Sequence, residues 1–194
     1  MDLSQHIRTI PDFPKPGILF YDISTLLIHP EGWQATVERL AEAIAPHEPD
    51  VLVGIESRGF LVAAPLALKL GLGFMMVRKK GKLPGSKISV SYTLEYGEDS
   101  MEIHDDALHA GGRVLLIDDL LATGGTAEAG IKLIEQLGGE IVAAAFVVDL
   151  PASKTSVTVP AEFLAPGTEY AFEILAEEAS GNKTITESDF ETTE

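Results

Sequence analysis

Two consecutive aspartates stand between an apolar run and a turn of small residues in the segment VLLIDDLLATGGT, residues 114–126. If the apolar run is a buried strand, Asp118 and Asp119 come at its carboxyl end. Where the chain leaves a sheet, both carboxylates can face the crevice that binds ligands in α/β proteins. Two carboxylates there can accept hydrogen bonds from a vicinal diol. The pair therefore predicts a diol-binding site.

The turn after the aspartates has the composition of a phosphate cradle. It consists of Ala122, Thr123, Gly124, Gly125 and Thr126. Glycines let backbone amides approach a phosphate closely, the next helix start supplies free N–H groups and a positive dipole end, and the threonines add hydroxyl donors. On these residues alone, an acidic tight turn that binds nothing stays an alternative.

A second candidate is the strongly basic stretch RKKGKLPGSK, residues 78–87, which holds five bases and no acid. It stands in a chain with 30 acidic and 14 basic side chains and a net charge of −16. Most charge runs are solvated surface, but an isolated positive patch in an acidic protein favours an anion-binding segment. We therefore take these residues as a candidate binding segment.

The composition excludes several classes of function. An acidic chain lacks the basic footprint that sequence-independent binding to nucleic acid or to an anionic membrane needs, so we predict neither partner. The absence of cysteine excludes disulfides, thiolate metal sites and a cysteine nucleophile. The N-terminus does not resemble a signal peptide and no apolar run reaches membrane-spanning length, so we predict a cytoplasmic protein.

No metal site made by the protein is predicted. The histidines lack the spacing of metal ligands and no cysteine assists them. They are His6, His29, His47, His104 and His109.

The elements that must position these residues alternate between strand and helix over residues 1–150, which predicts a mostly parallel α/β sheet. Short apolar runs predict buried strands at 51–55, 73–77, 114–117 and 141–148. Apolar residues at helical spacing predict helices from Glu31 to Pro46, after Gly59, and through Ile131, Ile134 and Leu137. The weaker alternation between Ile88 and Ile103 predicts a hairpin or loop laid over the sheet.

With these elements in place, residues 114–126 resemble the phosphoribosyl pyrophosphate (PRPP) signature of the type I phosphoribosyltransferases. Four further segments, in order and at similar spacing, narrow the resemblance to the adenine phosphoribosyltransferase family. They are FPKPGILFYDI (13–23), ESRGF (56–60), RKKGKLPG (78–85) and LEYG (94–97). The resemblance covers residues 7–150 and implies the type I fold, a twisted sheet with flanking helices and a mobile hairpin or loop.

The resemblance implies the transfer of a phosphoribosyl group from PRPP to adenine, giving AMP and pyrophosphate. It implies Mg²⁺ as cofactor, bound through oxygens of PRPP and pyrophosphate rather than by a protein metal site, and a homodimer. Ala122 and Gly125 stand where enzymes for 6-oxopurines usually carry aspartate and lysine, which argues for adenine over hypoxanthine or guanine.

Roles carried over from the family concern first the sugar and its phosphates. Asp118 and Asp119 match the ribose carboxylates, and residues 122–126 match the cradle of the 5-phosphate. Ser57 and Arg58 match the pyrophosphate loop, in which the arginine is also catalytic and offers a fork of donors. Arg78, Lys79 and Lys82 match the flexible loop, which we expect to be poorly ordered until it closes over pyrophosphate.

Further roles concern the base. Glu95 matches the catalytic carboxylate that, with a raised pKa, donates a proton to N7 of the purine. Phe20 matches the ring that stacks on adenine, with backbone groups of Leu19 and Tyr21 at its amino edge. The family often has arginine where this chain has Tyr21. A core phenylalanine and an exposed loop glutamate are the alternatives that the residues alone allow.

A boundary is predicted near Pro151. Residues 1–150 have a net charge of −9 and residues 151–194 one of −7, so the second segment is far more acidic per residue. Tyr170, Phe172 and Ile174 alternate with polar residues, which predicts a β-rich tail. Residues 164–170 and the strands after them resemble the end of a fibronectin type III domain, although too few residues follow Pro151 for its seven strands. We therefore predict a junction between a truncated transferase and part of an unrelated β domain, through fusion, engineering or computational generation.

Three functions remain open at this point. The leading one is an active adenine phosphoribosyltransferase, with a phosphoribosyltransferase for another purine as its close variant. The second is a PRPP-binding module or regulator without turnover. The third, which only the tail suggests, is a non-catalytic β-type interaction protein.

Overall fold

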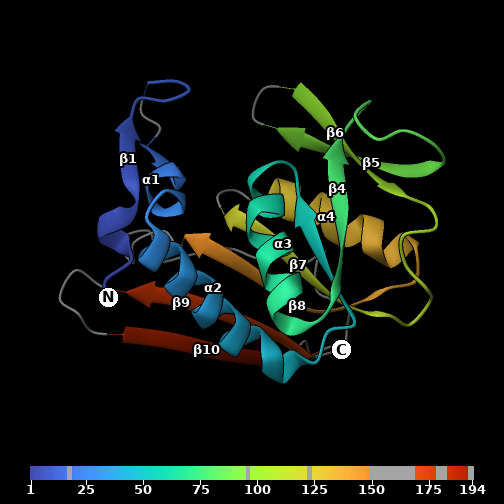
Figure 1. Cartoon of the computed structure of the whole chain (residues 1–194). Coiled ribbons are helices and arrows are strands. Elements are labelled where there is room, and N and C mark those ends of the chain that lie inside the picture. Colours follow the sequence, from blue (N-terminus) through green and yellow to red (C-terminus); the bar gives the residue numbers. More distant parts are fainter. Residues whose placement is uncertain (17–18, 95–96, 122–123, 149–168, 178–182, 192–194) are drawn as a thin grey trace.

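A six-stranded sheet in the order β5-β6-β4-β3-β7-β8 organises the molecule (Figure 1). The computed structural model describes residues 1–16, 19–94, 97–121, 124–148, 169–177 and 183–191. Strands β3, β4, β7 and β8 are parallel, and β6 joins them antiparallel to β4 and β5. The strands are β3 (Val51–Ile55), β4 (Gly73–Lys79), β5 (Lys87–Leu94), β6 (Gly97–His104), β7 (Arg113–Leu120) and β8 (Glu140–Val148).

Helices cover both faces of the sheet, with α2 and α3 on one face and α4 on the other (Figure 1). They are α2 (Pro30–Ile44), α3 (Arg58–Leu70) and α4 (Gly125–Gln136). Along β7, Leu115 and Ile117 join the cluster under α2 and α3, while Val114 and Leu116 join the opposite cluster. A strand buried on both faces needs apolar residues at successive positions, which explains the continuous apolar run that predicted β7.

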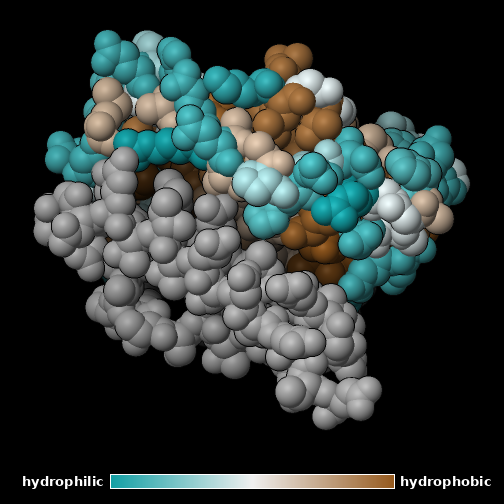
Figure 2. Space-filling view, turned by 90° about the horizontal axis from the view of Figure 1, so that it is seen from below, coloured by the Kyte–Doolittle hydropathy of each residue, from teal (hydrophilic) through white to brown (hydrophobic). Residues whose placement is uncertain are grey.

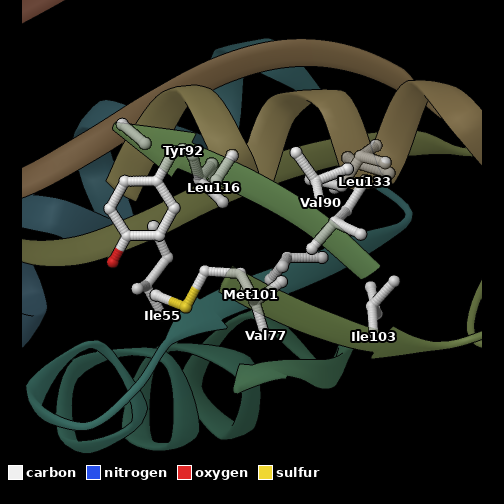
Figure 3. Packing of buried hydrophobic residues seen from close by; sticks show 13 residues of the cluster. Ile55, Val77, Val90, Tyr92, Met101, Ile103, Leu116 and Leu133 are labelled. Carbon is white, nitrogen blue, oxygen red and sulfur yellow. The ribbon is translucent and has the colours of Figure 1, made fainter. Parts of the chain in front are cut away.

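The predicted hairpin between Ile88 and Ile103 is present as β5 and β6, which pair antiparallel over their whole length. Its inward residues Val90, Tyr92, Met101 and Ile103 pack with Leu133 of α4 (Figure 3). The hairpin thus extends the sheet and also closes the core over α4.

Strand β7 is longer than predicted. It continues beyond Ile117 to Leu120, and its register pairs Asp118 with Phe146 and Leu120 with Val148 of β8. The two aspartates therefore lie within the strand and not where the chain has left the sheet. Pairing to the long apolar strand β8 keeps β7 extended here, although the aspartates interrupt its apolar run.

The N-terminal region forms a small unit that the sequence did not predict. A two-stranded sheet pairs β1 (Arg8–Pro11) with β2 (Leu19–Asp22), followed by α1 (Ser24–Leu27). A short 3-10 turn at Ser4–His6 precedes β1, and a second one at Ala45–His47 follows α2. Arg8 pairs with Asp22, and Asp22 also accepts from the backbone N–H of Ser24 at 2.9 Å. These strands are too short for a periodic pattern, so only their mutual pairing reveals them.

The predicted strand around Tyr170 to Ala176 is confirmed as β9 (Glu169–Glu177), which pairs antiparallel with β10 (Lys183–Glu191). These two strands form a sheet of their own, separate from the six-stranded sheet. Within the described ranges no helix is long and apolar enough to cross a membrane.

Candidate active site

The predicted sugar residues and the predicted pyrophosphate loop meet where β3 and β7 end. The two strands are parallel neighbours, with Gly54 opposite Ile117, so residues 56–58 come out beside Asp118 and Asp119. Gly59 allows the close approach, since a Cβ on it would lie 2.7 Å from the carbonyl oxygen of Ile117. Parallel neighbouring strands thus create the crevice at their carboxyl ends.

Asp118 and Asp119 are both buried, with 8% and 4% of their surface exposed. The backbone N–H of Asp119 donates to Oδ1 of Asp118 at 2.9 Å. Burial, followed by the neighbouring charge of Asp119, raises the pKa of Asp118 well above its usual range. Two carboxylates held together with little water favour a ligand that brings hydroxyl donors or positive charge.

Arg58 connects this pair to the predicted base site. Its Nε forms an ion pair with Oδ2 of Asp119, and its guanidinium lies 4.9 Å from the ring centroid of Phe20. The ring of Phe20 is in turn 5.1 Å from that of Phe13, in an edge-to-face arrangement. The predicted ribose, pyrophosphate and adenine residues therefore form one continuous set of contacts.

The phosphate-cradle candidates lie at the start of α4, next along the chain from β7. Gly124 has φ +83°, a left-handed conformation that favours glycine, and it caps the helix that begins at Gly125. No side chain caps the helix start, and Thr126 lies in the first turn. The first-turn N–H groups are therefore available to an anion. Ala122 and Thr123 lie outside the described residues.

The other predicted base residues are only partly placed. Leu19, Phe20 and Tyr21 lie on β2, where Leu19 is exposed and the other two are half-buried. Glu95 lies outside the described residues, between β5 and β6, so its role stays a prediction.

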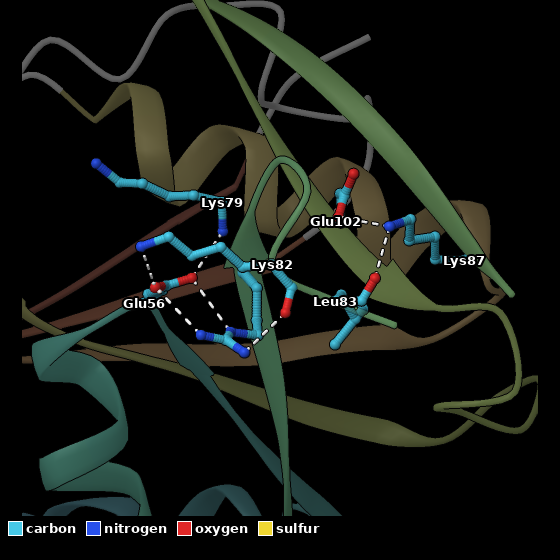
Figure 4. A network of polar contacts seen from close by, with 7 residues as sticks. Glu56, Lys79, Lys82, Leu83, Lys87 and Glu102 are labelled. Carbon is cyan, nitrogen blue, oxygen red and sulfur yellow. Dashed lines mark hydrogen bonds and ion pairs between the residues drawn. The ribbon is translucent and has the colours of Figure 1, made fainter. Parts of the chain in front are cut away.

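The basic segment is held by two buried carboxylates that the sequence analysis did not single out, Glu56 and Glu102 (Figure 4). Although burial opposes it, hydrogen bonds from Lys82, from the backbone of Lys79 and from Arg78 lower the pKa of Glu56 to about 2. At the other end, Lys87 lies 3.1 Å from Glu102. The sequence feature that could have identified Glu56 is a charged residue directly after an apolar run that forms a buried strand.

Leu83 also anchors the basic segment. It is 3% exposed, and its carbonyl accepts from the ammonium of Lys87 at 2.6 Å. The segment is therefore pinned at both ends and in its middle in this form of the protein, and its expected mobility before ligand binding stays a prediction.

Comparison with known proteins shows a likeness over most of the chain. The family model described as "Phosphoribosyl transferase domain" matches residues 23–163, which runs beyond the predicted boundary at Pro151. The adenine phosphoribosyltransferase of Rhodospirillum centenum is 64% identical over 166 residues, covering 84% of this chain and 97% of that protein.

Solved structures show the same likeness. The crystal structure of adenine phosphoribosyltransferase from Rhodothermus marinus has a TM-score of 0.75 at 51% identity and covers 82% of this chain and 91% of that one. The Saccharomyces cerevisiae enzyme, complexed with an imino-altritol bisphosphate and adenine, has a TM-score of 0.72 at 42% identity and covers 77% and 87%.

Proposed function

The chain belongs to the phosphoribosyltransferase family and within it to the adenine phosphoribosyltransferases, and from this membership we propose how its residues carry out the reaction. The enzyme is a pentosyltransferase that moves the 5-phosphoribosyl group of PRPP to N9 of adenine, giving AMP and pyrophosphate. The observation that carries the assignment of roles is the set of contacts from Asp119 through Arg58 to Phe20. It joins a sugar-binding carboxylate, an anion-binding fork and an aromatic face.

The sugar hydroxyls are bound by hydrogen-bond acceptors, and the phosphates are bound by N–H donors and positive charge. Asp118 and Asp119 accept hydrogen bonds from the ribose diol, and the start of α4 with residues 122–126 binds the 5-phosphate. As the bond from C1 to pyrophosphate breaks, positive charge builds on the ribose and negative charge on the leaving group. Ser57 and Arg58 stabilise the leaving pyrophosphate, together with the basic segment.

The base is held on the opposite side of C1. Phe20 stacks on adenine, and backbone groups of Leu19 and Tyr21 contact its amino edge. Glu95 donates a proton to N7 while N9 attacks C1, which makes the purine a better nucleophile. Arg58 lies over one face of Phe20, so adenine can stack on that face only if Arg58 shifts.

Magnesium fits this site as an ion carried by the substrate. Within the described ranges no group of three or more histidine, aspartate or glutamate side chains could hold a metal ion. The ion would be held by oxygens of PRPP and pyrophosphate and by water, while Asp118 and Asp119 beside it accept from the ribose diol. Bound there, the ion would neutralise charge on pyrophosphate.

A homodimer is supported by apolar side chains at the surface. Leu61 and Leu68, seven residues apart on α3, are 49% and 85% exposed, and Met76 on β4 is 39% exposed. Seen from below, the described part of the molecule shows apolar side chains (brown) beside polar ones (teal) (Figure 2). A second copy would bury such a face through a two-fold contact. A cytoplasmic location stays the prediction made from the sequence.

One assay tests the function. Purified protein with PRPP and Mg²⁺ is given adenine, hypoxanthine or guanine in turn, and release of pyrophosphate is followed. We expect turnover with adenine and a kcat/KM lower by about 100-fold or more with the two 6-oxopurines. A site built for the amino group of adenine leaves its buried polar groups unpaired when a 6-oxopurine binds. Binding of PRPP without turnover of any base would instead support a regulator, and faster turnover of a 6-oxopurine would reassign the substrate.

A further inference from the structure

Glu56 is a buried carboxylate to which the proposed mechanism gives no role. It follows β3 directly and stands two residues before Arg58, where α3 begins. Its backbone N–H donates to the carbonyl of Val77 at 2.9 Å, and its side chain is only 7% exposed. A carboxylate in such a place requires donors, because burying an unpaired charge is costly.

The basic segment provides those donors (Figure 4). The guanidinium of Arg78 donates to Glu56 through Nε at 3.2 Å and Nη2 at 3.4 Å. The backbone N–H of Lys79 and the ammonium of Lys82 each donate at 2.9 Å. The carboxylate of Glu56 thus accepts hydrogen bonds from both ends of the short turn at residues 79–82.

Arg78 also closes that turn. Its Nη1 donates to the carbonyl of Lys82 at 2.8 Å, and the N–H of Lys82 donates to the carbonyl of Lys79 at 3.2 Å. Each nitrogen of the guanidinium is therefore engaged within the protein. Arg78 cannot leave for a ligand without opening the turn.

Lys82 differs from Arg78 in this respect. Its side chain is 55% exposed, against 28% for Arg78, and its ammonium has three donors on a flexible stem. It can turn from Glu56 toward a ligand while the backbone of the turn stays in place.

We propose that Glu56 is a positioning residue for pyrophosphate binding, which holds the turn of residues 79–82 beside the start of α3 through Arg78. Lys82 is the cation that moves from Glu56 to the phosphate oxygens. The inference rests on the proposed function and deepens it, since it separates the roles of two bases that share one prediction. Arg78 and the N–H of Lys79 keep Glu56 paired after Lys82 has moved.

Glu56→Gln tests the proposal because it keeps the shape of the side chain and removes its charge. We expect the KM for PRPP to rise roughly tenfold, as for loss of a buried charged hydrogen bond, while kcat and the KM for adenine at saturating PRPP stay within about twofold of wild type. Glu38→Gln is the control, since it removes an exposed ion pair with Lys69 on another part of the surface. A roughly tenfold fall of kcat with an unchanged KM for PRPP would overturn the proposal.

A double-mutant cycle separates positioning from direct contact. Arg78→Lys keeps the charge but loses the fork, so it should raise the KM for PRPP as Glu56→Gln does. If Arg78 acts through Glu56, the double variant is no worse than the weaker-binding single variant. Additive effects would mean that Arg78 acts on the ligand by itself, which contradicts the proposed division of roles.

Limited trypsin digestion of the ligand-free protein gives a readout that does not need turnover. In Glu56→Gln the turn should open, and cleavage after Lys79, Lys80 and Lys82 should become several-fold faster. In Lys82→Gln, Arg78 and the backbone of Lys79 should still hold the turn on Glu56, so cleavage after Lys80 should stay as slow as in wild type. Unchanged cleavage in a Glu56→Gln protein with wild-type thermal unfolding would overturn the proposal. If wild type binds PRPP without turnover, the proposed function fails, but the digestion still decides the role of Glu56.

Discussion

Asp118 shows how a single residue can serve a ligand at a cost to the fold. Its carboxyl lies inside β7, 8% exposed, directly beside the more buried Asp119. Burial and that neighbouring charge favour its protonated form. In the mechanism that we propose, PRPP binding uses the carboxylate as an acceptor. The residue is therefore a site where stability and function oppose each other.

This conflict predicts a pH dependence of the free energy of unfolding. Because the folded pKa of Asp118 is raised, the folded state binds the proton more tightly than the unfolded state, and stability falls as the pH rises from about 4 through the raised pKa. Asp118→Asn removes this loss. We expect it to stabilise the ligand-free protein by about 2 kcal/mol at pH 8 and to weaken PRPP binding.

Urea unfolding at several pH values between 4 and 9 checks this. The gain from Asp118→Asn should shrink toward the acidic end of the range. A stability difference that does not change with pH would contradict the assigned titration of Asp118.

At the scale of elements, the site depends on how closely the start of α3 packs on the end of β7. The contact sets Arg58 within reach of Asp119. It requires a residue without a side chain at position 59, because the atoms that a Cβ would meet belong mostly to the backbone of Ile117 and Asp118.

Gly59→Ala should therefore push α3 away from β7. We expect a loss of about 1–3 kcal/mol of unfolding free energy, typical of overpacking, together with weaker PRPP binding as Arg58 moves off Asp119. Thermal unfolding and PRPP titration measure the two effects. Gly73→Ala is the matched control, because a Cβ there meets nothing within 4 Å; equal effects of both substitutions would refute the packing argument.

At the scale of the whole molecule, the acidity of the protein and its affinity for an anionic sugar are reconciled locally. The net charge of −16 surrounds a site whose positive groups are Arg58, the basic segment and the start of α4. Three of the five bases of that basic segment pair with the buried carboxylates Glu56 and Glu102. Affinity for phosphate then arises without a basic surface.

The exposed leucines of α3 give a prediction for assembly. Leu68→Glu should convert a homodimer into a monomer of 20.7 kDa, because it places a charge on the face we assign to the contact. Size-exclusion chromatography with light scattering measures the mass. Ile28→Glu is the control, as Ile28 is 82% exposed but follows α1 and is not part of α3. A Leu68→Glu protein that remains dimeric would exclude this face.

The sequence by itself determined the features that depend on neighbouring residues. The alternation of strands and helices and the places of the four strands were predicted from apolar runs and are confirmed, although β4 and β8 are mostly half-buried rather than buried. A hairpin was predicted to lie over the sheet, whereas β5 and β6 extend the sheet itself. The acidic pair and its glycine turn were recognised because a phosphate cradle is built from consecutive backbone groups. The division at Pro151 stays a prediction.

Only the tertiary structure decided which distant residues meet. The contact of Arg58 with Asp119 and Phe20, the pairing of β1 with β2, the extension of β7 and the hold of Glu56 on Arg78 all join positions far apart in the chain. Such contacts follow from the order of strands in the sheet and from burial. Local periodicity records which side of an element is buried, but not the partner against which it packs.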